Sequence, residues 1–201
     1  LELKGSFQFD GRSVSGEGDE DTFLARRLRP TLELQSGDLS FRLTPDFAGT
    51  PRVMDAHADY QFHEALVVRA GKFKPPLGLE RLQSASDLFL VERGLPANLT
   101  PNRDIGLELY GRPVPQMKYQ LAVLNGAPDG ANYDSDDDTG KDVVARVFFH
   151  PFKHAGIAPL EKLGAGLAGS WGTREGTPET PLLSAYRTAG QQTFFTPLDN
   201  G

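Results

Sequence analysis

The chain of 201 residues has no cysteine, which excludes a disulfide scaffold, a thiolate metal site and a cysteine nucleophile. No apolar run approaches the roughly 18 residues that a membrane helix needs. Hydrophobic residues make up only 38% of the chain, which is little for a two-layer core but enough for strands that are apolar on one face. No basic segment followed by an apolar stretch opens the sequence, so we expect any signal peptide to have been removed.

Basic residues are outnumbered overall, and the formal net charge is -6. Two short segments, 17–21 and 127–138, hold nine of the 27 acidic residues and no Lys or Arg. The rest of the chain therefore carries 21 basic and 18 acidic residues and is mildly basic. The acidic total argues against a nucleic-acid-binding face, and we predict no nucleic-acid partner.

Apolar and polar residues alternate along most of the sequence. In the first segment Leu3, Phe7 and Phe9 fall on one face, and Lys4 and Gln8 fall on the other. A period of two is typical of a strand with one dry and one wet face. The same pattern recurs and predicts nine strands: 1–10, 22–34, 39–44, 54–62, 66–74, 105–111, 117–124, 142–149 and 163–171.

The connections between these strands tend to alternate in length. Short turns are expected at 36–38, 63–65 and 112–116, whereas longer links are expected at 11–21, 75–103, 127–140 and from 172 onward. The links at 45–53 and 150–162 fit this alternation less well. Short turns at one end and long loops at the other are typical of an outer-membrane β-barrel. Charged residues in mid-strand on the wet faces and aromatic residues near strand ends favour this interpretation.

Two alternatives remain open. A soluble antiparallel domain that binds carbohydrate would show the same alternation, with its apolar face turned inward. An outer-membrane barrel could also serve a structural or adhesive role instead of transport.

The long connection at 75–103 is expected to be ordered. Pro75 and Pro76 end the preceding strand, and Ser84 can cap a short helix. An apolar face to anchor that helix is expected from Leu88, Phe89, Val91 and Leu95. In a barrel, such a loop can fold into the lumen and narrow it.

Polar side chains of this connection offer hydroxyl and charge-assisted donors, which are the groups that an oxyanion needs. The candidates are Arg81, Ser84, Ser86 and Arg93, with Lys72 and Lys74 close by in the sequence. Ion pairs between these arginines and neighbouring acidic residues are the alternative.

Other candidate sites are weaker. The acidic residues of 134–138 could bind calcium, but they lack EF-hand spacing and are better interpreted as a solvated loop. His150 and His154 are separated by Pro151, which argues against a helix that presents both to a metal. No serine–histidine–aspartate or paired-carboxylate arrangement stands out, so we predict no enzyme activity, no metal and no cofactor.

Several motifs resemble one known family, the phosphate-selective porins O and P. The segments that carry the resemblance are 26–30 (RRLRP), 44–49 (TPDFAG), 71–81 (GKFKPPLGLER), 90–93 (LVER), 103–106 (RDIG) and 121–126 (LAVLNG).

The resemblance implies a transmembrane barrel of about 16 antiparallel strands, of which residues 1–201 would be the N-terminal part. It implies passive diffusion of anions such as phosphate or a polyphosphate across the bacterial outer membrane, contact with membrane lipid and assembly as a homotrimer. The connection 75–103 would be the inward constriction loop, and Arg81, Ser84 and Arg93 would bind the anion. Phosphate-specific members of the family have two adjacent serines in this loop, whereas in this chain Ser84 is followed by Ala85.

A series of basic residues would line the lumen: Arg26, Arg27, Arg29, Arg42, Arg69, Lys72, Lys74 and Arg146. Strict alternation puts Lys72 and Lys74 on the face opposite Arg69, so a bulge near Gly71 is expected to turn them inward.

Overall fold

The protein is described by a computed structural model, in which strands dominate. The residues that the structure describes are 1–13, 22–90, 92–134, 136, 139–173, 185–188 and 192–196. The predicted segments 11–21, 127–140 and 172 onward therefore lie partly outside the described residues.

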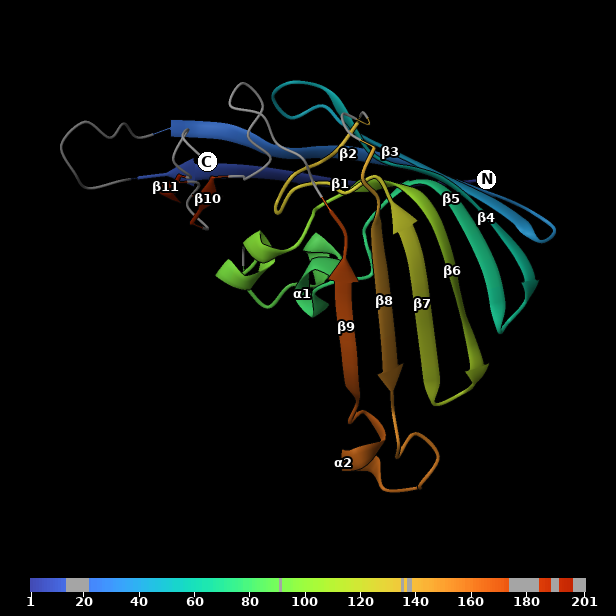
Figure 1. Ribbon diagram of the computed structural model, residues 1–201. Coiled ribbons are helices and arrows are strands. Elements are labelled where there is room, and N and C mark those ends of the chain that lie inside the picture. Colours follow the sequence, from blue (N-terminus) through green and yellow to red (C-terminus); the bar gives the residue numbers. More distant parts are fainter. Residues whose placement is uncertain are drawn as a thin grey trace.

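Nine strands form one antiparallel sheet in which each strand pairs with the next in the sequence. The predicted all-β fold with nine strands is confirmed. Within the described residues the sheet is open, with β1 and β9 as its edges (Figure 1). The strands are β1 Glu2–Arg12, β2 Thr22–Ser36, β3 Leu39–Asp46, β4 Arg52–His63, β5 Leu66–Phe73, β6 Asp104–Val114, β7 Met117–Leu124, β8 Asp142–Phe149 and β9 Ala165–Trp171.

The two faces of the sheet differ as the alternation predicts. On β7, Leu121 and Val123 are exposed on the convex face, whereas Gln120, Ala122 and Leu124 are buried on the concave one. Large apolar side chains are also exposed at the other end of the sheet, including Phe7 and Phe9 of β1. An apolar convex face and a polar concave face are the pattern of a barrel wall that separates lipid from water.

Two of the register shifts in the sheet, between β1 and β2 and between β3 and β4, change which side chains face inward. Arg27 pairs with Gln8 and Ala25 pairs with Phe9, so Arg26 is an extra residue in β2. Between β3 and β4 a similar shift leaves Met54 unpaired. A bulge turns its extra residue out of the alternation, and Met54, which the period of two assigns to the apolar outer face, is buried instead.

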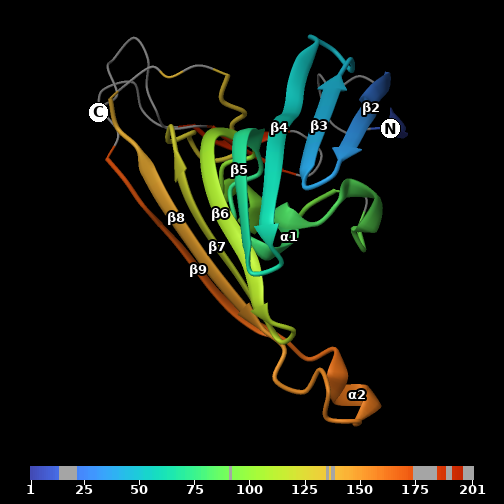
Figure 2. The same cartoon turned by 90° about the vertical axis from the view of Figure 1, so that its right-hand side faces the viewer.

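The connection after β5 lies on the concave side of the sheet. It contains the short helix α1 (Leu79–Leu82) and the 3₁₀ helices η1 (Ala85–Asp87) and η2 (Leu95–Leu99). Figures 1 and 2 both show this segment within the curve of the sheet. Beneath it, Leu77 packs against the only apolar core cluster of the described residues, which consists of Phe73, Ala122, Leu124 and Val144.

The apolar anchor predicted for this connection is observed only in part, because Leu88 is half-buried and the other described members of the set are exposed. Ser84 does cap η1, because its side chain accepts a hydrogen bond from the backbone N–H of Ser86. Phe89 is fully exposed, Leu95 is about half exposed, and Val91 lies outside the described residues. The connection is held mainly by polar contacts instead.

The remaining connections contain short elements. The helix α2 (Ala158–Glu161) lies in the link between β8 and β9 at the short-turn end of the sheet (Figure 2). The stretch predicted as a long loop from 172 onward contains a two-stranded hairpin, β10 (Tyr186–Arg187) and β11 (Thr193–Phe195). Across the described segments, no helix is both long enough and apolar enough to span a membrane.

Candidate functional site

The connection 75–103 and the concave face of the sheet enclose two cavities. The loop-side cavity, of about 740 Å³, lies between the connection, β2 and the segment 130–132. The turn-side cavity, of about 870 Å³, lies toward the short turns and is lined by β3, β4 and residues of β7 and β8. Arg42, Asp55, Lys74 and Leu82 line both cavities, so they mark the boundary between the two.

Positive charge is concentrated in the loop-side cavity. Its lining includes two acidic residues, Asp55 and Glu92, against ten basic ones. The turn-side cavity is nearly balanced, with five basic and four acidic residues in its lining. The ten basic residues are Arg26, Arg27, Arg29, Arg42, Arg52, Lys74, Arg81, Arg93, Arg103 and Arg187.

Arg81 is a buried residue that holds the connection together. Its side chain donates to the backbone oxygen of Ala97, to Thr100 Oγ1 at 3.3 Å and to Asn102 Oδ1 at 3.2 Å. These acceptors are neutral, and no ion pair to Arg81 is found within the described part of the chain. The guanidinium therefore folds the loop around itself while its charge stays uncompensated.

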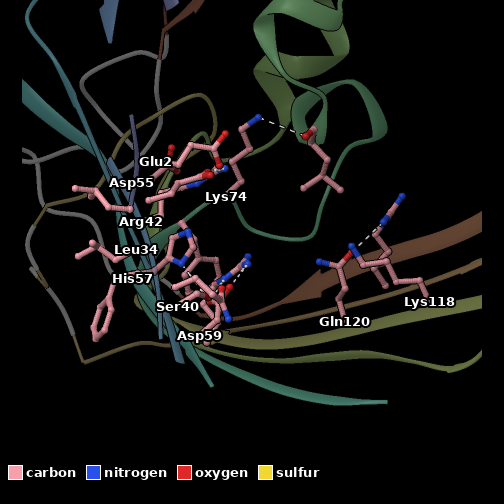
Figure 3. A pocket seen from close by; sticks show the side chains of 18 residues that line it. Glu2, Leu34, Ser40, Arg42, Asp55, His57, Asp59, Lys74, Lys118 and Gln120 are labelled. Carbon is pink, nitrogen blue, oxygen red and sulfur yellow. Dashed lines mark hydrogen bonds and ion pairs between the residues drawn. The ribbon is translucent and has the colours of Figure 1, made fainter. Parts of the chain in front are cut away.

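Arg93 and Lys74 meet at the end of α1. Arg93 Nη2 donates to the backbone oxygen of Gln83 at 2.7 Å, and its Nε donates to that of Glu80 at 3.1 Å. Lys74 Nζ donates to the same Gln83 oxygen at 2.8 Å and to the Leu82 oxygen at 3.4 Å, the contact drawn in Figure 3. Like Arg81, both cations are bound by neutral backbone carbonyls.

Burial, and then the mutual repulsion of these cations, lowers their pKa values. Burial first, and then the nearby Arg93 and Arg103, lower the pKa of Arg81 to about 10. Burial and the nearby guanidinium of Arg27 lower the pKa of Arg93. Burial and then the guanidiniums of Arg103 and Arg93 lower the pKa of Lys74 to about 7.

Most other arginines of the loop-side cavity are paired with acids. Arg26 Nε and Arg27 Nη2 both bind Glu92, at 3.0 and 2.6 Å. Because the bulge at Arg26 lets two consecutive side chains point inward, one carboxylate of the connection is held by two strand residues. The other pairs are Arg29 with Asp46, Arg42 with Glu33 and Arg103 with Asp55.

A hydrogen-bonded network crosses the wall of the turn-side cavity. Arg69 forms a two-point contact with Asp59, at 2.7 and 2.9 Å, and reaches Glu108 at 3.0 Å. Tyr110 donates to Asp59 at 3.0 Å, and Gln120 donates to Glu108 at 2.7 Å. Strands β4 to β7 are thus tied together on their concave side, where the charge of Arg69 is neutralised by two carboxylates.

All of the site residues that the family resemblance predicts, except one, line either the loop-side or the turn-side cavity. Arg81, Ser84 and Arg93 line the loop-side cavity, together with Lys74 and the predicted arginines of β2 and β3. Arg69 and Arg146 line the turn-side cavity. Ser84 Oγ is hydrogen-bonded to Ser86 Oγ at 2.8 Å and is exposed.

Lys72 is the exception, because it lines neither cavity. The pairing of β5 with β4 and β6 runs without a shift from Arg69 to Lys72, so the predicted bulge near Gly71 is absent. Lys72 is buried on the face opposite Arg69 and forms an ion pair with Asp134. Lys74 reaches the cavity without a bulge because β5 ends at Phe73.

Sequence reasoning missed three basic residues of the loop-side cavity. Arg52 begins β4, Arg103 precedes β6, and Arg187 lies in the hairpin β10–β11. Arg103 is part of one of the family motifs, and its place directly before a strand rich in inward-facing polar residues is a sequence signal that would indicate a cavity residue. Arg187 is brought to the cavity by the contact of its backbone oxygen with Asn98 Nδ2, at 2.7 Å, which no local pattern reveals.

Metal binding finds no support in the part of the chain that the structure describes, where no group of three or more His, Cys, Asp or Glu could hold an ion. Two of the acidic residues weighed for calcium, Asp137 and Asp138, lie outside that part.

A curved antiparallel meander with an apolar convex face, a charged concave face and a connection folded into its curve defines a porin of the outer membrane. The family described as phosphate-selective porin O and P matches residues 1–182, and the chain belongs to it. The predicted family is thereby confirmed. Its members are outer-membrane channels rather than enzymes. No curated protein matches the chain.

Proposed function

We propose that the loop-side cavity is the selective segment of a passive anion channel and that the connection 75–103 is its constriction. The observation that carries this proposal is the excess of ten basic over two acidic residues in the cavity lining. A water-filled passage with charge of one sign on its walls concentrates ions of the opposite sign.

Within the described residues, five of the ten cations form no ion pair, and two of these, Arg52 and Arg187, are exposed. The other three, Lys74, Arg81 and Arg93, are bound by backbone carbonyls and neutral side chains, and we propose that they supply most of this field. Backbone carbonyls orient a cation without cancelling its charge, so these three residues stay attractive to anions while their positions are fixed.

The roles of the three cations differ. Arg81 has its donors directed to Ala97, Thr100 and Asn102 and is buried, so we propose that it positions the connection. Arg93, Lys74 and the exposed Ser84 are proposed to contact the passing anion. Phosphate, with several oxygens that accept charge-assisted hydrogen bonds, fits such donors better than chloride does.

The convex face supports one further proposal. Its exposed apolar side chains, such as Leu43, Leu107 and Leu121, are proposed to contact membrane lipid. Assembly as a homotrimer stays a prediction from the family resemblance.

Ion selectivity in planar lipid bilayers tests the proposed channel. The zero-current potential in a KCl gradient is expected to show preference for chloride, and phosphate is expected to block the chloride current. Arg93→Gln removes an unpaired charge and should lower the ratio of anion to cation permeability severalfold. The matched control is the double variant Arg42→Gln/Glu33→Gln, which removes an ion pair and no net charge and should leave the ratio nearly unchanged.

Cation preference of the unmodified protein would overturn the proposal. An Arg93→Gln variant with unchanged selectivity would instead favour a structural or adhesive barrel.

A further inference from the structure

We propose that the ammonium group of Lys74 is a pH-sensitive latch, which holds the end of α1 in the lumen and strengthens anion selectivity only while it is protonated. This inference rests on the proposed anion channel and adds its regulation. It concerns a single side chain at the boundary of the two cavities.

The position of Lys74 makes it a link between the wall and the loop. Its backbone directly follows β5, and its Nζ donates to the oxygens of Leu82 and Gln83, which end α1. Arg93 donates to the same Gln83 oxygen from the other side of the connection. One carbonyl thus joins two cations, and both belong to the set that is not paired with carboxylates.

The groups that face Lys74 are mostly cationic. Arg81 comes from α1, Arg93 from the connection and Arg103 from the start of β6. From β4, Asp55 is the nearby acid, but both of its oxygens are bound by Arg103, at 2.6 and 3.4 Å. Arg42 of β3 shares both cavity linings with Lys74.

Such surroundings destabilise the charged form of Lys74. Burial, then repulsion by Arg103 and Arg93, lowers the pKa of the Lys74 ammonium to about 7, and Asp55 opposes this only in part. A lysine with a lowered pKa is charged below that pH and neutral above it. Raising the pH through neutrality therefore removes one of the three carbonyl-bound charges and weakens the hold on α1.

A histidine, His57, also lines the turn-side cavity. Its Nδ1 lies 3.2 Å from Asp59 Oδ1, and its ring contacts Phe73 edge-on. The experiment on Lys74 therefore includes a variant that removes this imidazole, so that an effect of pH can be assigned to one of the two side chains.

The test uses the purified porin in planar lipid bilayers with a KCl gradient at about pH 5.5 and about pH 8.5, on either side of the Lys74 transition. Chloride is the probe because its charge does not change with pH. The unmodified protein should show a ratio of anion to cation permeability roughly two- to threefold higher at the lower pH, since loss of one wall charge in a narrow passage has an effect of this order.

Two substitutions at position 74 isolate the lysine. Lys74→Arg keeps a charge that cannot be lost in this range, so its selectivity should be high and equal at both pH values. Lys74→Met should be less selective, again equally at both, and its open-channel current should be noisier because α1 loses a donor. His57→Gln should keep the pH step of the unmodified protein.

The possible outcomes distinguish a failure of the proposed anion channel from a failure of the proposed Lys74 latch. A protein that prefers cations at every pH would overturn the proposed channel. An anion-selective protein without a pH step, or a step that persists in Lys74→Arg, would overturn the latch and leave the channel standing. A step that disappears in His57→Gln would assign the titration to the imidazole and would equally overturn the latch.

Discussion

At the scale of single residues, the groups that bind a basic side chain determine whether its positive charge acts on the passage. Arg29 and Arg81 are both arginines of the loop-side cavity, but Arg29 is neutralised by Asp46 at 2.8 Å, whereas Arg81 is bound by neutral acceptors. The first therefore stabilises the wall, and the second adds to the electrostatic field of the passage. Counting basic residues without their partners overstates the field.

Substitutions of Arg81 can distinguish the effect of its positive charge from the effect of its hydrogen-bond geometry. Lysine keeps the charge but cannot reproduce the planar set of donors that reaches Ala97, Thr100 and Asn102. Arg81→Lys should therefore retain much of the anion selectivity while the single-channel current becomes noisier, because each buried acceptor left without a donor costs about 1–3 kcal/mol. Arg81→Gln should lose both properties.

Single-channel recordings at low and high salt measure this difference. A lysine variant as quiet as the unmodified protein would show that Arg81 does not organise the connection. Ser84→Ala is the matched control in the same connection, and it should change the current noise little because Ser84 is exposed and bonded only within η1.

At the scale of elements, a bulge in one strand and a loop from another part of the chain act together. The extra residue in β2 lets Arg26 and Arg27 hold Glu92, more than 60 positions further along the chain. This contact fixes the far part of the connection 75–103, and Leu77 over the apolar cluster at Phe73 fixes its beginning.

Glu92→Gln should loosen the connection without weakening the positive field. An amide cannot form two charge-assisted contacts, so the hold on Arg26 and Arg27 is lost, while the cavity gains one net positive charge. We expect larger fluctuations of the open-channel current and a ratio of anion to cation permeability that is equal or higher. A quiet channel with reduced anion preference would contradict this account of the Glu92 contact.

At the scale of the whole molecule, the sheet is a boundary between two solvents. Neighbouring residues on one strand therefore face opposite media, and β3 offers a matched pair. Leu43 is exposed on the convex face and lines neither cavity, whereas Ser40 lines the turn-side cavity.

An arginine at each of these positions should have different consequences. Leu43→Arg places a charge against lipid, which costs up to about 2–4 kcal/mol depending on its depth, and should reduce the yield of folded protein in the outer membrane. Ser40→Arg should fold normally and increase the anion preference slightly. The shift of the folded band on unheated gels measures folding, and equal yields for the two variants would argue against lipid on the convex face.

Much of this fold could be predicted from local pattern. The alternation along β1, β3 and β7 fixes which face is apolar, because successive side chains of a strand point to opposite sides whatever their partners are. Proline pairs such as Pro75–Pro76 mark where a strand ends. Bulges could not be predicted, because the extra residue at Arg26 or Met54 appears only when two strands are aligned.

For the candidate site, the chemistry follows from the sequence alone, which has a connection rich in arginine, lysine and serine between strands with charged wet faces. Which of these charges remain uncompensated depends on the fold. Arg81, Arg93 and Lys74 are bound by carbonyls, Arg26 and Arg27 share one carboxylate, and Lys72 is paired outside the cavities. Partners distant in sequence determine whether a charge is neutralised, and only the folding of the connection against the sheet brings those partners within hydrogen-bonding distance.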